Sequence, residues 1–226
     1  MNDNREMTVI ARIHTPFAGK FGVPRQSGLA PTEGRIVFAP AYRNPDALRG
    51  LEGFSHLWLI WVFDRAERKD WSPTVRPPRL GGNRRMGVFA TRSPFRPNPI
   101  GLSCVELAAV EWSTPDGPVL HVRGADLVDG TPILDIKPYL PYCDAKPQAT
   151  GGFTDGLTGG ALQVVCPPEL LARLPEKDRP GLLAVLGGDP RPRYQDDPGR
   201  VYGLTYGQRN VKFRVAGDVL TVEDVE

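Results

Sequence analysis

The chain has 226 residues, 40% of them hydrophobic and 24% charged, and its formal net charge is only +2. This length and hydrophobic content allow one large domain or two small ones with a true core, and the charge excludes a highly basic chain that binds nucleic acid through its total charge. The 24 prolines and 25 glycines favour many turns and short strands over a helical bundle.

At the start of the chain, residues 1–8 are polar and charged and contain no apolar segment, so we expect no secretory signal. The longest apolar run, residues 57–63, is too short to span a membrane. These features predict a soluble cytoplasmic protein with no membrane partner.

Alternating and apolar runs predict three strands in the first part of the chain. Between the second and the third, Asn44 is expected to cap a short helix that begins at Pro45. The segment after the first strand, TPFAGKFGVPRQSGL, is rich in turn residues and predicts a loop. The predicted strands are residues 8–14, 35–38 and 55–64, and the bulky residues of the last one predict burial on both of its faces.

Residues 71–105 are the most unusual stretch, because they contain six arginines, six prolines and four glycines but no lysine and no acidic residue. Guanidinium groups without a nearby carboxylate suit bidentate recognition of phosphate or carboxylate. A proline-rich connector with solvated arginines is the simpler interpretation, but the apolar run at 86–90 argues against disorder. We therefore predict an anion site, with nucleic acid as the expected ligand.

Beyond this stretch, the Asp116-Gly117 dipeptide between residues 102–112 and 119–123 is typical of a β-hairpin. A further strand is expected at 133–136.

The composition changes near residues 145–160, which predicts a boundary between a domain at 1–147 and a second domain at 148–226. The second domain is expected to be a small α+β unit. Its predicted helices are residues 168–174 and 180–186, and its predicted strands are 201–204 and 211–222. The predicted fold is thus mainly β, with an N-terminal β-barrel and a smaller α+β C-terminal domain.

Several common chemical templates are absent from the sequence. It contains neither GxGxxG nor GxxxxGK[ST], and neither GxSxG nor HExxH. The three cysteines, Cys104, Cys143 and Cys166, are far apart and form no CxxC, which predicts buried free thiols and no metal site.

Five longer motifs are more specific: VPRQSGL, RGLEGFSHLWLI, RPPRLGGN, MGVFATRSPFRPNPIGLS and DLVDGTPILDIKPYLP. In this order they closely resemble the TrmO (TsaA/YaeB-like) family over residues 8–143, with weaker similarity at 189–194 and in the final strands. Members of this family are tRNA N6-methyltransferases that use S-adenosylmethionine (SAM). The resemblance implies a non-Rossmann, SAM-binding β-barrel, in agreement with the missing GxGxxG, and a homodimer with SAM held by loops near the subunit interface.

The resemblance also implies a substrate and a set of SAM contacts. The substrate is N6 of threonylcarbamoyladenosine at adenosine 37, next to the anticodon of threonine tRNA. Position 64 is expected to be histidine in better-known relatives, so the side chain of Asp64 puts the local affinity in doubt. The cofactor contacts fall on Gln26, Ser27, Gly28, Phe63, Asp64, Arg92, Leu102, Ile133, Leu134, Asp135 and Ile136.

These residue types suit SAM. Arg92 can pair with its carboxylate, and Asp135 can accept from a ribose hydroxyl or from the ammonium group. An apolar slot for adenine can be formed by Phe63, Leu102, Ile133 and Leu134, although ordinary barrel core is the simpler interpretation of these four.

Methyl transfer requires alignment of N6 with the methyl group and removal of the N6 proton. Asp129 and Asp135 are candidates for orienting or accepting that proton, although Asp129 also suits a cap of the DGTP turn. The tRNA itself is expected to meet the remaining arginines, one of which can fork the carboxylate of the threonylcarbamoyl group. These are Arg76, Arg79, Arg84, Arg85 and Arg96.

Two other functions remain open. A non-catalytic RNA-binding β-barrel would use the arginines equally well, and a SAM-dependent enzyme acting on a small molecule would leave most of them without a role. The motifs VPRQSGL, ATRS and ILDI favour the tRNA methyltransferase. For the homodimer, the exposed-looking run 133–140 is the one hint from the residues themselves.

Overall fold

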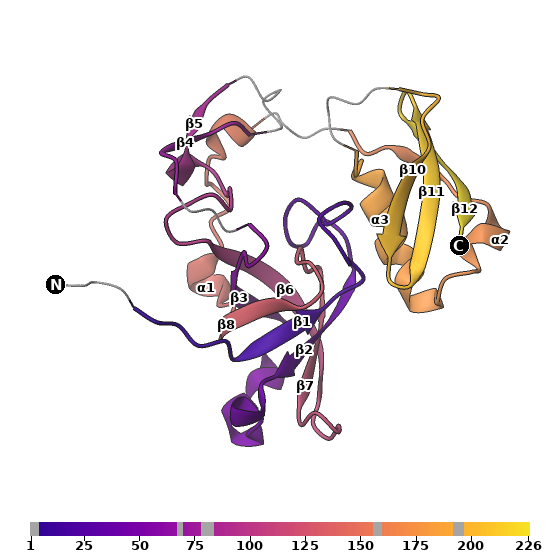
Figure 1. The fold of residues 1–226 in the computed structure, drawn as a ribbon. Coiled ribbons are helices and arrows are strands. Elements are labelled where there is room, and N and C mark those ends of the chain that lie inside the picture. Colours follow the sequence, from indigo (N-terminus) through magenta and orange to yellow (C-terminus); the bar gives the residue numbers. More distant parts are fainter. Residues whose placement is uncertain (1–4, 67–69, 78–83, 156–159, 192–196) are drawn as a thin grey trace.

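The structure, a computed structural model, describes residues 5–66, 70–77, 84–155, 160–191 and 197–226. Six strands form a closed barrel, and four later strands form a second sheet with two short α-helices beside it (Figure 1). The predicted fold, mainly β with an N-terminal barrel and a smaller α+β part, is therefore confirmed. The boundary between residues 147 and 148 stays a prediction.

The barrel closes because each strand pairs antiparallel with two neighbours, in the order β1-β2-β7-β6-β3-β8. Side chains alternate along the strands between the interior and the surface, and Ile13, Ile36 and Leu59 are fully buried inside. The strands are β1 (Ala11–His14), β2 (Glu33–Phe38), β3 (His56–Val62), β6 (Ile100–Glu111), β7 (Val119–Arg123) and β8 (Thr131–Pro138).

The exposure of β3 differs from the prediction of two buried faces. Leu57 and Leu59 are buried in the barrel, but the alternate side chains on the other face, Trp58, Ile60 and Val62, are only half-buried. Trp58 is partly covered by the segment around α1 (Pro141–Asp144), since its Nε1 donates to a carboxylate oxygen of Asp144 at 2.9 Å. The prediction was wrong because an antiparallel barrel encloses only one face of its strands.

The predicted helix at Pro45 is a series of short 3-10 turns instead of an α-helix. Asn44 caps it as expected, with its side-chain oxygen accepting from the backbone N–H of Asp46 at 3.0 Å. The turns are η1 (Pro40–Tyr42), η2 (Pro45–Leu48) and η3 (Leu51–Gly53).

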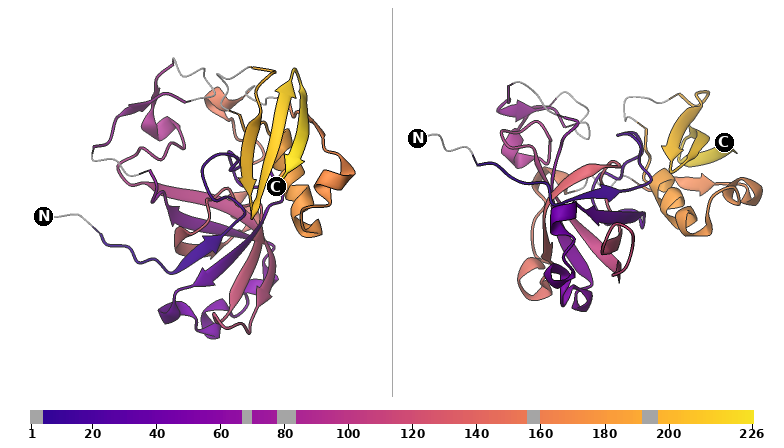
Figure 2. Two further views of the ribbon diagram at one scale, coloured as in Figure 1. Left: turned by 45° about the vertical axis from the view of Figure 1, so that its right-hand side comes forward. Right: turned by 60° about the horizontal axis from the view of Figure 1, so that its bottom comes forward.

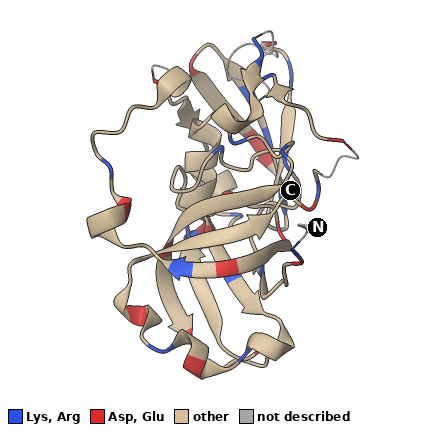
Figure 3. Ribbon diagram, turned by 90° about the vertical axis from the view of Figure 1, so that its left-hand side faces the viewer, with Lys and Arg blue, Asp and Glu red and all other residues tan. Residues whose placement is uncertain are grey.

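The arginine-rich stretch contains a short two-stranded ribbon in which β4 (Thr74–Val75) pairs with β5 (Met86–Gly87). It continues into η5 (Val88–Ala90), where Val88 is buried. This ribbon lies on one side of the barrel and the second sheet lies on the other, in all three views (Figures 1 and 2). Elsewhere on the barrel, basic and acidic residues are interspersed, as the small net charge requires (Figure 3).

The second sheet has the order β10-β11-β12-β9, and β9 pairs parallel with β12. Its core includes Leu182 and Leu186 from α3 and Leu204 and Phe213 from the sheet. The elements are η6 (Gly152–Thr154), β9 (Gln163–Val165), α2 (Pro168–Leu171), η7 (Glu176–Asp178), α3 (Arg179–Gly187), β10 (Tyr202–Tyr206), β11 (Arg209–Ala216) and β12 (Val219–Val225).

The strand predicted at residues 211–222 is in fact part of a hairpin. Gly217, with a φ of 59°, turns the chain between β11 and β12, and this left-handed conformation favours glycine. The apolar alternation continues on both sides of the turn, so it did not reveal the break. β9, which was not predicted, is only three residues long.

The loop between β1 and β2 connects the two cores. Phe17 and Ala30 are buried in the core of the second sheet, and the Phe17 ring packs edge-on against Tyr206 with ring centroids 5.8 Å apart. The N–H of Gly207 donates to the carbonyl of Pro16 at 2.7 Å. This loop contains the VPRQSGL motif, so the second sheet supports one of the predicted cofactor segments.

Two smaller expectations need correction. The cysteines are free as predicted, but Cys143 is exposed and Cys104 and Cys166 are only half-buried. The run 133–140 does not form an exposed surface, because Ile133 and Leu134 are buried, so the hint of a subunit contact there is lost. Across the described part of the chain, no helix is long and apolar enough to cross a membrane.

Candidate functional site

A cavity of about 620 Å³ lies where β3 ends and β6 begins. Four segments that are distant in sequence meet there: the loop after β1, the end of β3, residues 91–102 and the turn at 126–131. Its volume is in the range of small-molecule sites. The lining residues include Gln26, Trp61, Phe63, Asp64, Arg92, Arg96, Leu102 and Asp126.

Gln26 and Arg92 meet at the wall of this cavity although they come from different loops. The Arg92 guanidinium donates to the side-chain oxygen of Gln26. Because a guanidinium has five N–H donors, Arg92 can hold Gln26 and still bind an anionic group of a ligand. The structure thus brings together two residues that were predicted to contact the cofactor.

Ser27 and Gly28 fasten the same loop to the barrel without lining the cavity. The Ser27 hydroxyl oxygen accepts from the backbone N–H of Cys104 at 3.1 Å, and the N–H of Gly28 donates to the carbonyl of Gly124 at 2.8 Å. Gly28 has a φ of 78°, which favours glycine at this position. These bonds hold the loop that carries Gln26, and the contact of Ser27 and Gly28 with the cofactor stays a prediction.

Asp126, which the sequence did not single out, is a half-buried carboxylate that lines the cavity. It accepts a hydrogen bond from the Ser103 hydroxyl at 2.5 Å, and Ser103 in turn accepts from the indole N–H of Trp61 at 3.0 Å. Burial raises the pKa of Asp126, while the hydrogen bonds from Ser103 and from the backbone N–H groups, together with the charge of Arg92, oppose that rise. A carboxylate in this environment suits a cationic ligand group.

The apolar part of the cavity is formed by Trp61, Phe63 and Leu102. The Trp61 and Phe63 rings are tilted by 57° with centroids 4.2 Å apart, and Leu102 is 55% exposed. Gly101 leaves room for the indole, since a Cβ atom there would lie 2.2 Å from Trp61 Cε2. Asp64, at the position where histidine was expected, lines the cavity and is exposed.

The four predicted cofactor residues on β8 do not line this cavity. Ile133 lies in the barrel core and Leu134 is buried, which agrees with the simpler interpretation of these two residues. Asp135 forms an ion pair with Lys137 at 2.8 Å and accepts from the N–H of Ile136 at 2.9 Å. Their contact with the cofactor stays a prediction.

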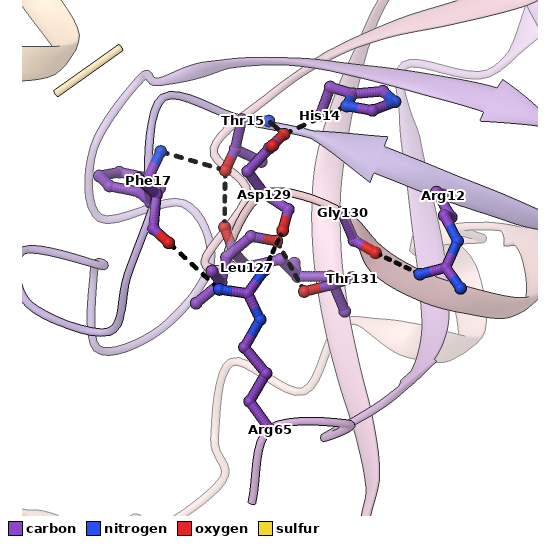
Figure 4. Close-up of polar contacts among 11 residues, drawn as sticks. Arg12, His14, Thr15, Phe17, Arg65, Leu127, Asp129, Gly130 and Thr131 are labelled. Carbon is purple, nitrogen blue, oxygen red and sulfur yellow. Dashed lines mark hydrogen bonds and ion pairs between the residues drawn. The ribbon is translucent and has the colours of Figure 1, made fainter. Parts of the chain in front are cut away.

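Asp129 is engaged in structural contacts at the end of β1 (Figure 4). Its carboxylate accepts from the backbone N–H of Thr15 at 3.1 Å and lies 3.2 Å from Nδ1 of His14. Its backbone carbonyl accepts from Arg65 at 2.8 Å. The Asp129 carboxylate therefore joins its turn to the end of β1 and, within the described residues, makes no contact that caps the DGTP turn, and neither Asp129 nor Asp135 is among the residues lining the cavity.

The arginines predicted to meet tRNA fall into two groups. Arg76, Arg84 and Arg85 are exposed on the β4-β5 ribbon and beside it, whereas Arg79 lies outside the described residues. Arg96 is half-buried, lines the cavity and donates to the backbone carbonyl of Thr91 at 2.9 Å. Arg96 thus belongs to the cavity wall, and its contact with tRNA stays a prediction.

Comparison with known proteins identifies the family of the chain. Residues 12–145 match the family model of the tRNA-methyltransferase O N-terminal domain, and residues 161–226 match that of the TrmO C-terminal domain. The chain is 45% identical over 215 residues to the tRNA (adenine(37)-N6)-methyltransferase of Escherichia coli K12, covering 91% of both chains. It is 49% identical over 173 residues to the enzyme of that name from Eikenella corrodens, covering 76% of this chain and 97% of the relative. A crystal structure of TrmO from Pseudomonas aeruginosa superposes with a TM-score of 0.81 at 34% identity and covers 100% of this chain and 98% of that one.

Proposed function

The chain belongs to the TrmO family of tRNA methyltransferases, and from this premise we propose that it transfers a methyl group from SAM to N6 of adenine 37 in tRNA. The observation that carries the proposal is the meeting of Gln26, Arg92 and Asp126 at one cavity of about 620 Å³. A non-catalytic RNA-binding barrel would have no need for such a cavity beside the arginine-rich ribbon.

The residues of the cavity fit SAM. Arg92 can pair with the carboxylate of SAM, and the half-buried carboxylate of Asp126 can face its positively charged part. Trp61, Phe63 and Leu102 offer an apolar surface for the adenine ring. The proposed SAM site consists of these residues with Gln26 and Asp64, and Ser27 and Gly28 support it from behind.

When bound, SAM supplies a methyl carbon that is already activated by the adjacent sulfonium. The transfer forms a bond between N6 and this carbon, breaks the bond between sulfur and carbon, and releases the N6 proton. The protein therefore has mainly to align N6 with the methyl carbon. In our proposal the carboxylate that faces the cofactor inside the cavity is that of Asp126. The carboxylate of Asp129 is engaged by the N–H of Thr15, and that of Asp135 is engaged in an ion pair with Lys137.

We propose that the specific substrate is threonylcarbamoyladenosine at position 37 of threonine tRNA. The threonylcarbamoyl group carries a carboxylate, and an arginine can bind it in a bidentate pair. Arg76, Arg84 and Arg85 support this proposal because they are exposed beside the cavity-lining segment. We further propose a cytoplasmic location, where tRNA is modified.

We also propose that the protein acts as a homodimer. Tyr142 is 86% exposed and Leu29 62% exposed, and large hydrophobic side chains this open to solvent support a partner of some kind. Light scattering coupled to gel filtration at micromolar concentration is expected to give twice the chain mass of 24.8 kDa. A stable monomer would contradict the dimer and leave a site that is complete within one chain.

Mass spectrometry of nucleosides tests the methyltransferase activity directly. Bulk tRNA is taken from a strain whose tRNA lacks the methyl group on N6 of adenosine 37. It is incubated with the protein and SAM, digested to nucleosides, and searched for that methyl group. We expect the methylated nucleoside only when both protein and SAM are present. If SAM and tRNA both bind but no methyl group is transferred, the non-catalytic barrel becomes the better description.

A further inference from the structure

Two exposed aromatic rings at the base of the arginine-rich ribbon have no role in the proposed function so far. Trp71 precedes β4 and Phe89 follows β5, and their rings lie within 28° of parallel with centroids 6.3 Å apart. Their exposed fractions are 53% and 74%. Large aromatic residues are usually mostly buried, so a stacked pair that is open to solvent suggests a binding surface.

The position of Phe89 is fixed by the turn that carries it. The neighbouring Val88 is 1% exposed, its N–H donates to the carbonyl of Pro73 at 2.9 Å, and its carbonyl accepts from the N–H of Thr91 at 3.1 Å. With Val88 anchored inward, the side chain of Phe89 points to solvent. The exposure of the ring therefore follows from an ordered turn.

Arg96 connects this aromatic pair to the cavity. Its guanidinium carbon lies 6.0 Å from the centroid of the Phe89 ring, within the range of a cation–π contact. The same side chain donates to the carbonyl of Thr91 and lines the cavity. The aromatic pair and the cavity thus share Arg96 as a common neighbour.

The surrounding charge favours a nucleic acid over an apolar protein surface as the occupant. Residues 71–105 contain no acidic residue, and Arg76, Arg84 and Arg85 are exposed in the same stretch. Phosphates attracted by these arginines would bring bases within reach of the rings. An enzyme that acts on a base must take it out of its stack, which leaves the neighbouring bases without a stacking partner.

We propose that Trp71 and Phe89 form a stacking platform for a base of the anticodon loop that flanks the target adenosine. This inference rests on the proposed function and adds a contact by which the substrate is positioned. Every base has a flat π surface, so the platform contributes affinity and placement but little sequence selectivity.

Variants that keep apolar volume but remove the ring test the platform. Phe89→Leu and Trp71→Leu in the full chain are compared with the ring-retaining variants Phe89→Tyr and Trp71→Phe. We expect each leucine variant to bind tRNA roughly 5- to 150-fold more weakly, the range for loss of one base–aromatic stack. The two ring-retaining variants should stay within a few-fold of the parent protein.

The salt dependence separates stacking from phosphate contacts. The leucine variants should lower the affinity by the same factor at every salt concentration, whereas Arg84→Ala should also reduce the slope of log affinity against log salt. An anticodon stem-loop RNA with 2-aminopurine on either side of the target should lose fluorescence on binding, and less so with Phe89→Leu. SAM affinity, measured by calorimetry, should be the same in all variants.

Two outcomes would overturn the platform. Unchanged tRNA affinity in both leucine variants would show that no base stacks there, and dissociation of a dimer by these substitutions would assign the rings to a subunit contact. These results are independent of the proposed function, because methyl transfer by the parent protein is measured separately. A parent protein that binds RNA through the platform but transfers no methyl group would refute only the proposed function.

Discussion

Arg92 joins the loop after β1 to the turn before β6, because its guanidinium donates to the side chain of Gln26. We expect Arg92→Ala to weaken SAM binding by about 1.5–3 kcal/mol, the usual worth of a hydrogen bond to a charged group. Calorimetry on the full chain measures this effect. Arg49→Ala is the control, since Arg49 is exposed, pairs with Asp46 and does not line the cavity. Equal affinities in the two variants would remove Arg92 from the site.

Asp126 is expected to have opposite effects on folding and on binding. Burial raises its pKa, so the folded chain disfavours the charged carboxylate that is present at neutral pH. The charged Asp126 side chain therefore lowers the free energy of unfolding at every pH above its raised pKa. This destabilisation disappears as the pH falls through the raised pKa toward the pKa of about 3.9 for aspartate in the unfolded chain, because the folded chain then binds the proton more readily.

The substitution Asp126→Asn separates the two effects, because it keeps an acceptor for the Ser103 hydroxyl and removes the charge. We expect the variant to be at least as stable as the parent at pH 7, with the difference shrinking in acid. SAM binding should weaken by about 1.5–3 kcal/mol, the range for a charged hydrogen bond. Thermal unfolding and calorimetry at several pH values provide both measurements. Tight SAM binding by the variant would mean that Asp126 only supports the fold.

At this scale the sequence motifs singled out Gln26 and Arg92, which line the cavity, but not Asp126, which lines it as well. The segment DLVDGTP contains two aspartates, and the one beside the turn, Asp129, was the more conspicuous candidate. Which of them faces the cavity depends on Ser103 of β6 and on the contacts of Thr15, both distant in sequence. The residues around an aspartate do not reveal which distant residues it contacts. The three-dimensional structure was therefore needed to tell which aspartate lines the cavity.

Among the elements, the loop between β1 and β2 depends most on a neighbour far along the chain. Gly22 has a φ of 86°, and a Cβ atom there would lie 2.1 Å from Cδ1 of Leu204, which is fully buried in β10. We expect Gly22→Ala to displace the loop, to weaken SAM binding at least several-fold, and to lower the unfolding free energy by more than the roughly 1–3 kcal/mol of backbone strain alone.

Gly50→Ala is the matched control for this element. Gly50 has the same φ of 86° but no atom within 4 Å of its added Cβ, so the control has the strain without the clash. SAM affinity of both variants is measured by calorimetry and their stability by thermal unfolding. If Gly22→Ala bound SAM as well as the control did, the second sheet would not help to position the cofactor loop.

The strands were predicted well where periodicity was strong and poorly where a turn was short. β1, β2, β3, β6, β7 and β8 all lie within or close to the expected ranges, because alternation in a barrel reflects one buried face. The hairpin at Gly217 was missed, since the turn between β11 and β12 is only two residues long. The packing of Phe17 in the second sheet was also not foreseen, as sequence patterns do not show which core a loop residue joins.

In the whole molecule, the positive charge is gathered on one ribbon while the net charge is only +2. Arg76, Arg84 and Arg85 are exposed there, and their contacts with tRNA phosphates would be mostly non-specific and sensitive to salt. Selectivity must then come from groups of the anticodon loop. The second sheet lies on the other side of the barrel and acts through the loop after β1, so its effect on tRNA is expected to be indirect (Figure 1).

The threonylcarbamoyl group offers the chemical feature on which such selectivity can act. Its carboxylate can be bound by one of the exposed arginines in a bidentate pair, whereas an unmodified adenosine leaves that arginine without its partner. We expect tRNA that already carries threonylcarbamoyladenosine to be methylated at least about 10-fold faster than the same tRNA transcribed without it, from the 1.5–3 kcal/mol of a charged hydrogen bond. Single-turnover assays with the two tRNAs at equal concentration measure the ratio, and phosphate contacts cancel because both RNAs share the same backbone. Arg76→Ala, Arg84→Ala and Arg85→Ala then identify the arginine, since only its loss should reduce the ratio. Equal rates for the two tRNAs would disprove recognition of the carboxylate and leave the methyltransferase activity unaffected.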